Sequence, residues 1–152
     1  MPQIRALNLP VMLAAKAVVE STQLGGATIK VGLGEAPDCP APYVILTRPT
    51  GGILTGTMAN PEADADHRVQ VIAVGELSEQ STRLLDAVRA TMTVENLQTE
   101  FDVLDLAGEV GASRRVSMVF IDVSRGETRE ERGLPEPLFS DIDQYIVRTH
   151  PK

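Results

Sequence analysis

Apolar residues recur at helical spacing in two segments of the chain. In the first, from about Leu9 to Thr22, apolar side chains form one stripe, and Lys16 and Glu20 lie opposite it. Pro10 suits an early helical position, and Gly25-Gly26 follows as a stop signal because glycine readily takes the left-handed cap conformation. The stripe consists of Val11, Ala14, Ala15, Val18 and Val19. We therefore predict a helix over this first segment.

The second helical segment runs from Ser78 to Met92. Ser78 is placed to cap its N-terminus, and Glu79 and Gln80 in the first turn suit the positive end of the helix dipole. The stripe predicted to be buried contains Leu84, Leu85, Val88 and Met92. This segment and the strand before it are predicted to form the packed centre of the protein.

Other segments have the alternating or continuous apolar patterns of strands. The clearest is His67–Val74, where Val69, Val71 and Ala73 alternate with other residues up to Gly75. The predicted strands are Thr28–Gly34, Tyr43–Thr47, Ile53–Thr57, His67–Val74, Phe101–Leu106 and Val116–Val123. The element order predicts an α+β fold, with a mixed or antiparallel sheet of about five to seven strands packed against two helices. Tyr43–Thr47 is almost continuously apolar, so we expect it to be covered on both faces.

Polar and proline-rich segments separate these elements. Glu35–Pro42 contains three prolines, and Asn60–Asp66 is acidic, so both are predicted to be connections. Gly126–Gly133 is densely charged without an apolar residue, which predicts a solvated loop. Asp141–Arg148 is expected to add a final edge strand or an arm. The predicted organisation is a single α+β domain over residues 1–133 and a C-terminal arm or edge strand over residues 134–152.

Composition excludes several classes of protein. The 152 residues carry a net charge of −7, which argues against a surface that neutralises nucleic-acid phosphates. One cysteine, Cys39, cannot form an internal disulfide. No apolar run approaches the roughly 18 residues of a membrane span, and Met1–Pro10 lacks the features of a signal peptide. We expect a protein made in a reducing cytoplasm, with no membrane partner.

Asp64, Asp66 and His67 are the strongest candidates for metal ligands, since three ligating side chains fall within four residues. A divalent site usually needs a further ligand, and the other histidine, His150, is near the C-terminus. An acidic connection that enters a strand explains the same residues. A small metal-dependent enzyme built on these three residues stays an alternative, and the favoured prediction has no metal site.

Other motifs give no catalytic centre. Gly32-Leu33-Gly34 lacks the third glycine and the following helix of a phosphate-binding turn. Cys39 has no histidine or basic residue nearby to lower its pKa. The basic residues Arg114, Arg115, Arg125, Arg129 and Arg132 favour protein contact or solvation over nucleic-acid recognition. The sequence therefore predicts a protein that is not an enzyme, with no catalytic or cofactor-binding residues and no cofactor.

The order of these blocks resembles the tail terminator proteins of long-tailed double-stranded DNA phages. The resemblance rests on the N-terminal helix, the short strand and proline-rich loop that lead into Ala41–Leu46, the strand Asp66–Val71, and the helix Ser78–Met92. It covers roughly residues 7 to 125. The charged segment after Gly126 and residues 134–152 match no part of the family pattern.

The resemblance implies a structural virion protein without catalytic residues. Such a subunit assembles in the host cytoplasm as a ring, usually a homohexamer, on the end of a completed tail tube. The ring stops polymerisation of the tube protein and joins the tail to the head-completion proteins at the head–tail junction, and the genome DNA passes through its lumen without specific binding. Related neck, head–tail joining and minor tail proteins share this pattern and stay alternatives.

Overall fold

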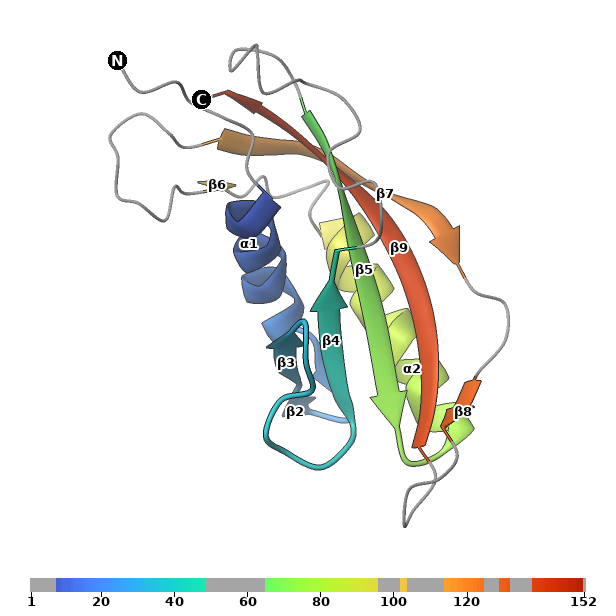
Figure 1. Cartoon of the computed structure of the whole chain (residues 1–152). Helices are drawn as coiled ribbons and strands as arrows, with labels where there is room; N and C mark the ends of the chain where they lie inside the picture. The colour runs from blue at the N-terminus through green and yellow to red at the C-terminus, as the bar shows by residue number, and fades with distance from the viewer. Residues whose placement is uncertain are drawn as a thin grey trace.

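The computed structural model describes residues 8–48, 65–95, 102–103, 114–124, 129–131 and 138–151 (Figure 1). Within these residues the chain forms helices and a mixed sheet, so the predicted α+β class is confirmed. The predicted strand Ile53–Thr57 and the candidate ligand Asp64 lie outside the described residues.

Both predicted helices are present. The first is α1 (Asn8–Glu20), and the second is α2 (Ser78–Arg89), which continues into a π-helical segment, η1 (Ala90–Glu95). Their apolar stripes pack into the core, with Val19 and Leu84 fully inaccessible, Leu85 only 5% exposed, and Ala14 and Val18 partly buried. Neither helix in the described part of the chain is long and apolar enough to cross a membrane.

The main sheet is mixed, and the described residues contribute seven strands to it. Its order is β3-β4-β5-β9-β7-β6, and β8 pairs with β9 beside this path. All neighbours are antiparallel except β3 and β4. The bounds are β3 (Lys30–Leu33), β4 (Tyr43–Thr47), β5 (Ala65–Gly75), β6 (Asp102–Val103), β7 (Arg114–Ser124), β8 (Arg129–Glu131) and β9 (Leu138–Pro151). A separate hairpin joins β1 (Gln23–Leu24) to β2 (Ala27–Thr28).

The C-terminal strand β9 is the central strand of the sheet. It pairs with β5 from Ala65↔Thr149 to Gly75↔Phe139, and with β7 and β8 on its other side. The expectation of a C-terminal arm or edge strand is therefore wrong for residues 138–151, which belong to the same domain as β5. In β9, Asp141 and Asp143 are buried and bind side chains of α2, and the partly exposed Arg148 binds Asp66 of β5.

The charged segment Gly126–Gly133 is not wholly a loop. Arg129–Glu131 forms β8 and pairs antiparallel with Leu138, Phe139 and Ser140. Strand pairing uses backbone groups, which a charged composition does not remove, and charged side chains are common on outer strands. The prediction of a solvated loop is therefore wrong for these three residues.

Strand β4 alternates instead of being covered equally on both faces. Val44 and Leu46 are fully buried, whereas Tyr43, Ile45 and Thr47 are half-buried. The expectation of full coverage failed because both helices pack on the same face of the sheet. That face holds the core, in which α1 and α2 meet Val44, Leu46, Val69, Val71, Ala73, Val119, Tyr145 and Val147.

Glycine is required at Gly32, where the loop Glu35–Pro42 leaves β3 and returns to begin β4. A Cβ atom at Gly32 would overlap the carbonyl oxygen of Glu35 and lie 2.9 Å from the backbone nitrogen of Pro37. The predicted loop is confirmed, and its close passage over Gly32 allows the parallel pairing of β3 with β4.

Candidate functional site

Polar side chains are buried between α2 and β9. Successive residues of a strand point to opposite faces, so Asp141, Asp143 and Tyr145 all lie on the face that α2 covers. Asp143 and Tyr145 are fully inaccessible, and Asp141 is 4% exposed. A buried carboxylate needs a partner that compensates for lost hydration, and α2 supplies one for each.

Asp143 is held by a two-bond interaction with Arg89, the last residue of α2. Arg89 Nε donates to Asp143 Oδ2 at 3.1 Å, and Arg89 Nη2 donates to Asp143 Oδ1 at 3.0 Å. The Tyr145 hydroxyl donates to the same Oδ2 atom at 3.2 Å. Three donors therefore converge on one carboxylate at the end of α2.

Asp141 is held by hydroxyl groups at the start of the same helix. Thr82 Oγ1 donates to Asp141 Oδ2 at 2.8 Å, and Ser81 Oγ lies 3.3 Å from the same oxygen. The two carboxylates of β9 therefore bind opposite ends of α2. The main effect of this arrangement is to fix the helix along the strand.

The pKa shifts agree with a structural role. Burial raises the pKa of Tyr145, and the charge of Asp143 and its hydrogen bond raise it further. The hydrogen bond to Asp143 raises the pKa of Arg89. Tyr145 therefore keeps its proton and Arg89 keeps its charge, so neither is suited to act as a general base near neutral pH.

The structure separates the predicted metal ligands. Asp66 accepts two hydrogen bonds from Arg148, Nε to Oδ1 at 2.7 Å and Nη2 to Oδ2 at 3.0 Å. His67, the next residue of β5, points to the opposite face and is 1% exposed. The placement of Asp66 in a connection is also wrong, since it lies within β5. Among the described residues, no three His, Cys, Asp or Glu side chains are grouped to hold a metal ion.

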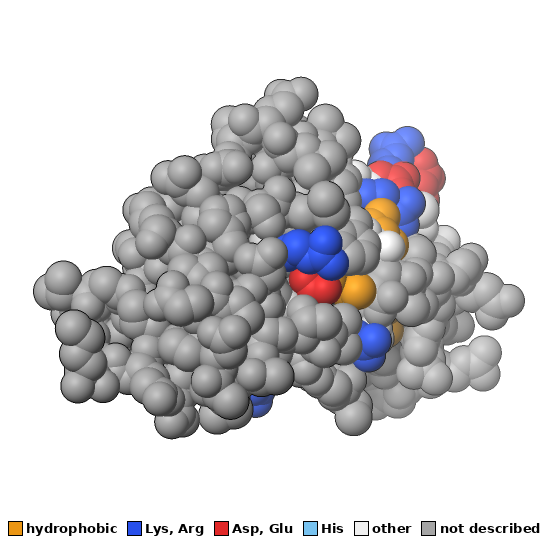
Figure 2. Space-filling view, turned by 90° about the horizontal axis from the view of Figure 1, so that it is seen from above, with side chains coloured by type: hydrophobic (Ala, Val, Ile, Leu, Met, Phe, Trp, Pro, Cys, Tyr) orange, Lys and Arg blue, Asp and Glu red, His pale blue; other side chains and the backbone are white. Residues whose placement is uncertain are grey.

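The remaining sequence candidates occupy varied positions. Gly32-Leu33 lies in β3 and Gly34 follows it, so this motif is a strand end. Cys39 is half-buried in the loop before β4. Arg114 and Arg115 lie in β7 and Arg129 in β8, while Arg125 and Arg132 lie outside the described residues. From above, described basic side chains are seen beside acidic and hydrophobic ones (Figure 2).

The face of the sheet opposite the helices carries a row of isoleucines. Ile45, Ile72 and Ile142 are register partners across β4, β5 and β9, and all three are half-buried. Beyond this row, Gln144 Nε2 donates to Gln70 Oε1 at 3.2 Å. The three β-branched side chains are partly accessible, whereas Val74 and Ile146 on the same face are buried.

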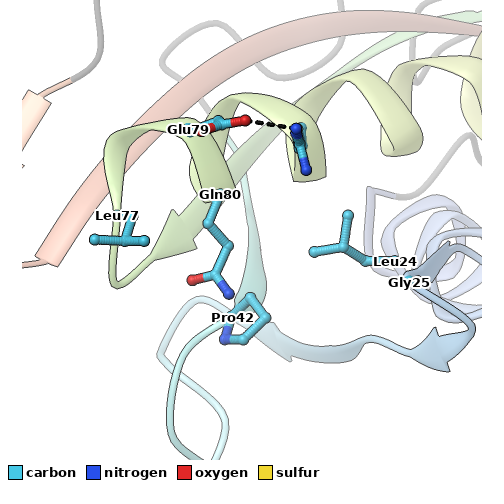
Figure 3. A pocket seen from close by; sticks show the side chains of 7 residues that line it. Leu24, Gly25, Pro42, Leu77, Glu79 and Gln80 are labelled. Carbon is cyan, nitrogen blue, oxygen red and sulfur yellow. Dashed lines mark ion pairs between the residues drawn. The ribbon is translucent and has the colours of Figure 1, made fainter.

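Two depressions lie at opposite ends of β4. One, of about 380 Å³, is at the start of α2 and has Leu77, Gln80 and Pro42 around it, with an ion pair between Glu79 and Arg83 (Figure 3). The other, of about 560 Å³, is lined by Met12, Leu33, Gly34, Leu46, Thr47 and Arg48. Their described linings resemble contact surfaces for protein side chains more than catalytic centres.

Sequence reasoning missed the α2–β9 polar network. The signal for it was the spacing of Asp141, Asp143 and Tyr145, which places all three on one face of a strand. The partner Arg89 lies outside the predicted buried stripe of α2, and only the packing of the helix on β9 brings it to Asp143. No protein-family model and no curated protein matches this chain.

Proposed function

We propose that this chain is a structural assembly protein of the tail terminator type, which forms a ring on the end of a phage tail tube. In this proposal the ring stops addition of tube subunits and presents a surface to the head-completion proteins. In this role the protein provides surfaces that are complementary to those of its partner proteins, and it makes or breaks no covalent bond. It acts in the virion, at the junction of head and tail.

The proposal rests on how the polar and apolar side chains are distributed. The buried carboxylates are bound by other side chains of the subunit, and a row of isoleucines lies on the sheet face that neither helix covers. Asp66, Asp141 and Asp143 each bind side chains of this chain. The isoleucine row of Ile45, Ile72 and Ile142 adds a surface suited to contact with another protein. The α+β fold also agrees with the family that the sequence resembles.

The metal-dependent alternative has less support. The bidentate interaction with Arg148 occupies both carboxylate oxygens of Asp66, and His67 lies on the other side of β5. Calorimetry with divalent ions, before and after alanine replacement of Asp64, Asp66 and His67, tests this alternative. The metal-dependent alternative would be favoured if the wild-type protein gave a heat of binding and a measured turnover, and if both disappeared in the variants.

Electron microscopy of purified tail tubes mixed with the protein tests the terminator proposal. We expect density on one end of each tube, and tubes of restricted length when the protein is present during polymerisation. The Leu85→Asp variant, whose core is disrupted, is the matched negative control. Tubes of uncontrolled length with abundant wild-type protein would contradict the proposal, and binding only to head-completion proteins would favour a neck protein.

A further inference from the structure

Leu77 occupies a position that is unfavourable for an isolated subunit. It is the N-cap of α2, with extended backbone angles of φ −126° and ψ 150°, and its side chain makes no capping hydrogen bond. Serine, threonine, aspartate and asparagine are preferred there because their side chains accept from the first helical N–H groups. Leu77 is also a large hydrophobic side chain that is 67% exposed. The prediction that Ser78 caps this helix is wrong, since Ser78 is its first residue.

Carboxylates flank this leucine on both sides. Glu76 and Glu79 are exposed, and Glu79 forms an ion pair with Arg83 one turn further along α2 (Figure 3). A sequence usually agrees with its fold at each local position, and departures from that agreement are expected at functional sites. We call Glu76, Leu77 and Glu79 the Leu77 knob.

A depression with complementary properties lies at the other end of β4. Leu33 gives it a partly exposed apolar side chain, with the buried Met12 and Leu46 beneath, and its volume of about 560 Å³ is ample for a leucine side chain. Arg48, which directly follows β4, is exposed and contributes a positive charge to the lining. We call this depression the Arg48 pocket. An apolar side chain with acidic flanks matches both its lining and its charge.

The register of the sheet separates the knob from the pocket. Tyr43 at the start of β4 pairs with Val74, three residues before Leu77, whereas the pocket is formed where β3 and β4 end. Five strand residues at about 3.3 Å each give a separation of roughly 15 Å. The knob therefore does not reach the pocket of its own chain.

We propose that Leu77 of one copy inserts into the Arg48 pocket of a second copy, with Glu76 and Glu79 of the first copy near Arg48 of the second. The contact is head-to-tail, because each copy uses the knob on one side and the pocket on the other. Repetition of such a contact forms a ring when its rotation closes. This inference rests on the proposed ring assembly and names its subunit contact.

Sedimentation velocity over a range of protein concentrations tests the contact. We expect wild-type protein to self-associate, and Leu77→Asp to weaken association at least tenfold while its thermal midpoint is maintained or raised. Ala17→Glu, which adds the same charge at an exposed position of α1, is the matched control and associates like wild type. Charge reversal gives a second test: Arg48→Glu weakens association, and Glu76→Arg in the same chain restores part of it.

Mixing two defective variants distinguishes this contact from a symmetric one. Leu77→Asp retains the pocket, and the double variant Thr47→Phe/Arg48→Glu retains the knob while its pocket is blocked. We expect each variant alone to be monomeric and the mixture to give a one-to-one dimer without larger species, because only one competent contact can form.

Several outcomes would overturn the inference. Wild-type protein that stays monomeric at every concentration contradicts it, and so does association that Leu77→Asp and the blocked-pocket variant leave unchanged. Failure of the two variants to combine in the mixture also contradicts it. The proposed function is tested separately, and it is contradicted when tail tubes are not capped. If the Leu77→Asp protein still forms rings that cap tubes, the proposed function is retained and only this subunit contact is ruled out.

Discussion

Arg89 and Asp143 form a two-bond ion pair that joins the end of α2 to the middle of β9, across 54 positions of sequence. The carboxylate of Asp143 is fully buried, whereas the side chain of Arg89 is 37% exposed. The pair therefore has one end in the core and one end near solvent. Its geometry explains how a strand with two acidic residues on its helix face can be central to the sheet.

We predict that Arg89→Met destabilises the protein by about 2–3 kcal/mol, because it leaves Asp143 buried without its charged partner. This expected loss of stability is smaller than the loss on breaking a fully buried ion pair, because Arg89 is partly solvated. Chemical denaturation of Arg89→Met, Asp143→Asn and the double variant measures the coupling between the two residues. A coupling energy near zero would show that the pair does not stabilise the fold.

The raised pKa of Tyr145 predicts that the protein loses stability in alkaline solution. Burial against α2 raises its pKa above the ordinary value of 10.0. The folded state thus keeps the proton at a pH where the unfolded chain releases it, so this contribution is complete below about pH 10 and declines as the pH rises further. Thermal unfolding at increasing pH checks the effect. Tyr145→Phe should show a weaker decline than wild type, and equal slopes would contradict the assignment.

Leu85→Asp should unfold the subunit. Leu85 lies in the core between α2 and the sheet, and a carboxylate there would be buried without a partner. We expect a loss of about 4 kcal/mol or more, measured by circular dichroism and denaturation. Asp86→Ala, at the adjacent exposed position, should change stability by less than about 0.5 kcal/mol. A soluble Leu85→Asp protein that melts like wild type would mean that the register of α2 is wrong.

Leu77→Asp should stabilise the isolated subunit by about 1 kcal/mol, because aspartate caps α2 and its charge suits the helix N-terminus. For a chain of this size the thermal midpoint should rise by about 3 °C. The measurement is made at a protein concentration low enough to keep wild type monomeric. A decrease in the midpoint would indicate that Leu77 packs within its own subunit.

Gly32→Ala should destabilise the connection between β3 and β4 by about 2–3 kcal/mol, since the added methyl group meets backbone atoms of Glu35 and Pro37. Backbone atoms cannot turn aside as a flexible side chain does. Thr28→Ala, at an exposed site in β2, is the control and should leave the denaturation midpoint nearly unchanged. Equal midpoints for the two variants would contradict the close passage of the loop.

The sequence by itself determined the elements whose apolar period matches a single buried face. Both helices, β4 and β5 were predicted closely, because periodicity and glycine or proline signals act within a few residues. It also determined the aliphatic character of the core, since the chain has few aromatic residues.

Tertiary structure alone decided where the C-terminal strand lies and which polar groups meet. Asp141 and Asp143 carry charge into the core, and only the proximity of Thr82 and Arg89 makes their burial favourable. The exposure of Leu77 was also decided by tertiary structure, because it depends on where α2 begins relative to the sheet. Pairing over long sequence separations depends on which elements pack together, and a local pattern of hydrophobic and polar residues does not record it.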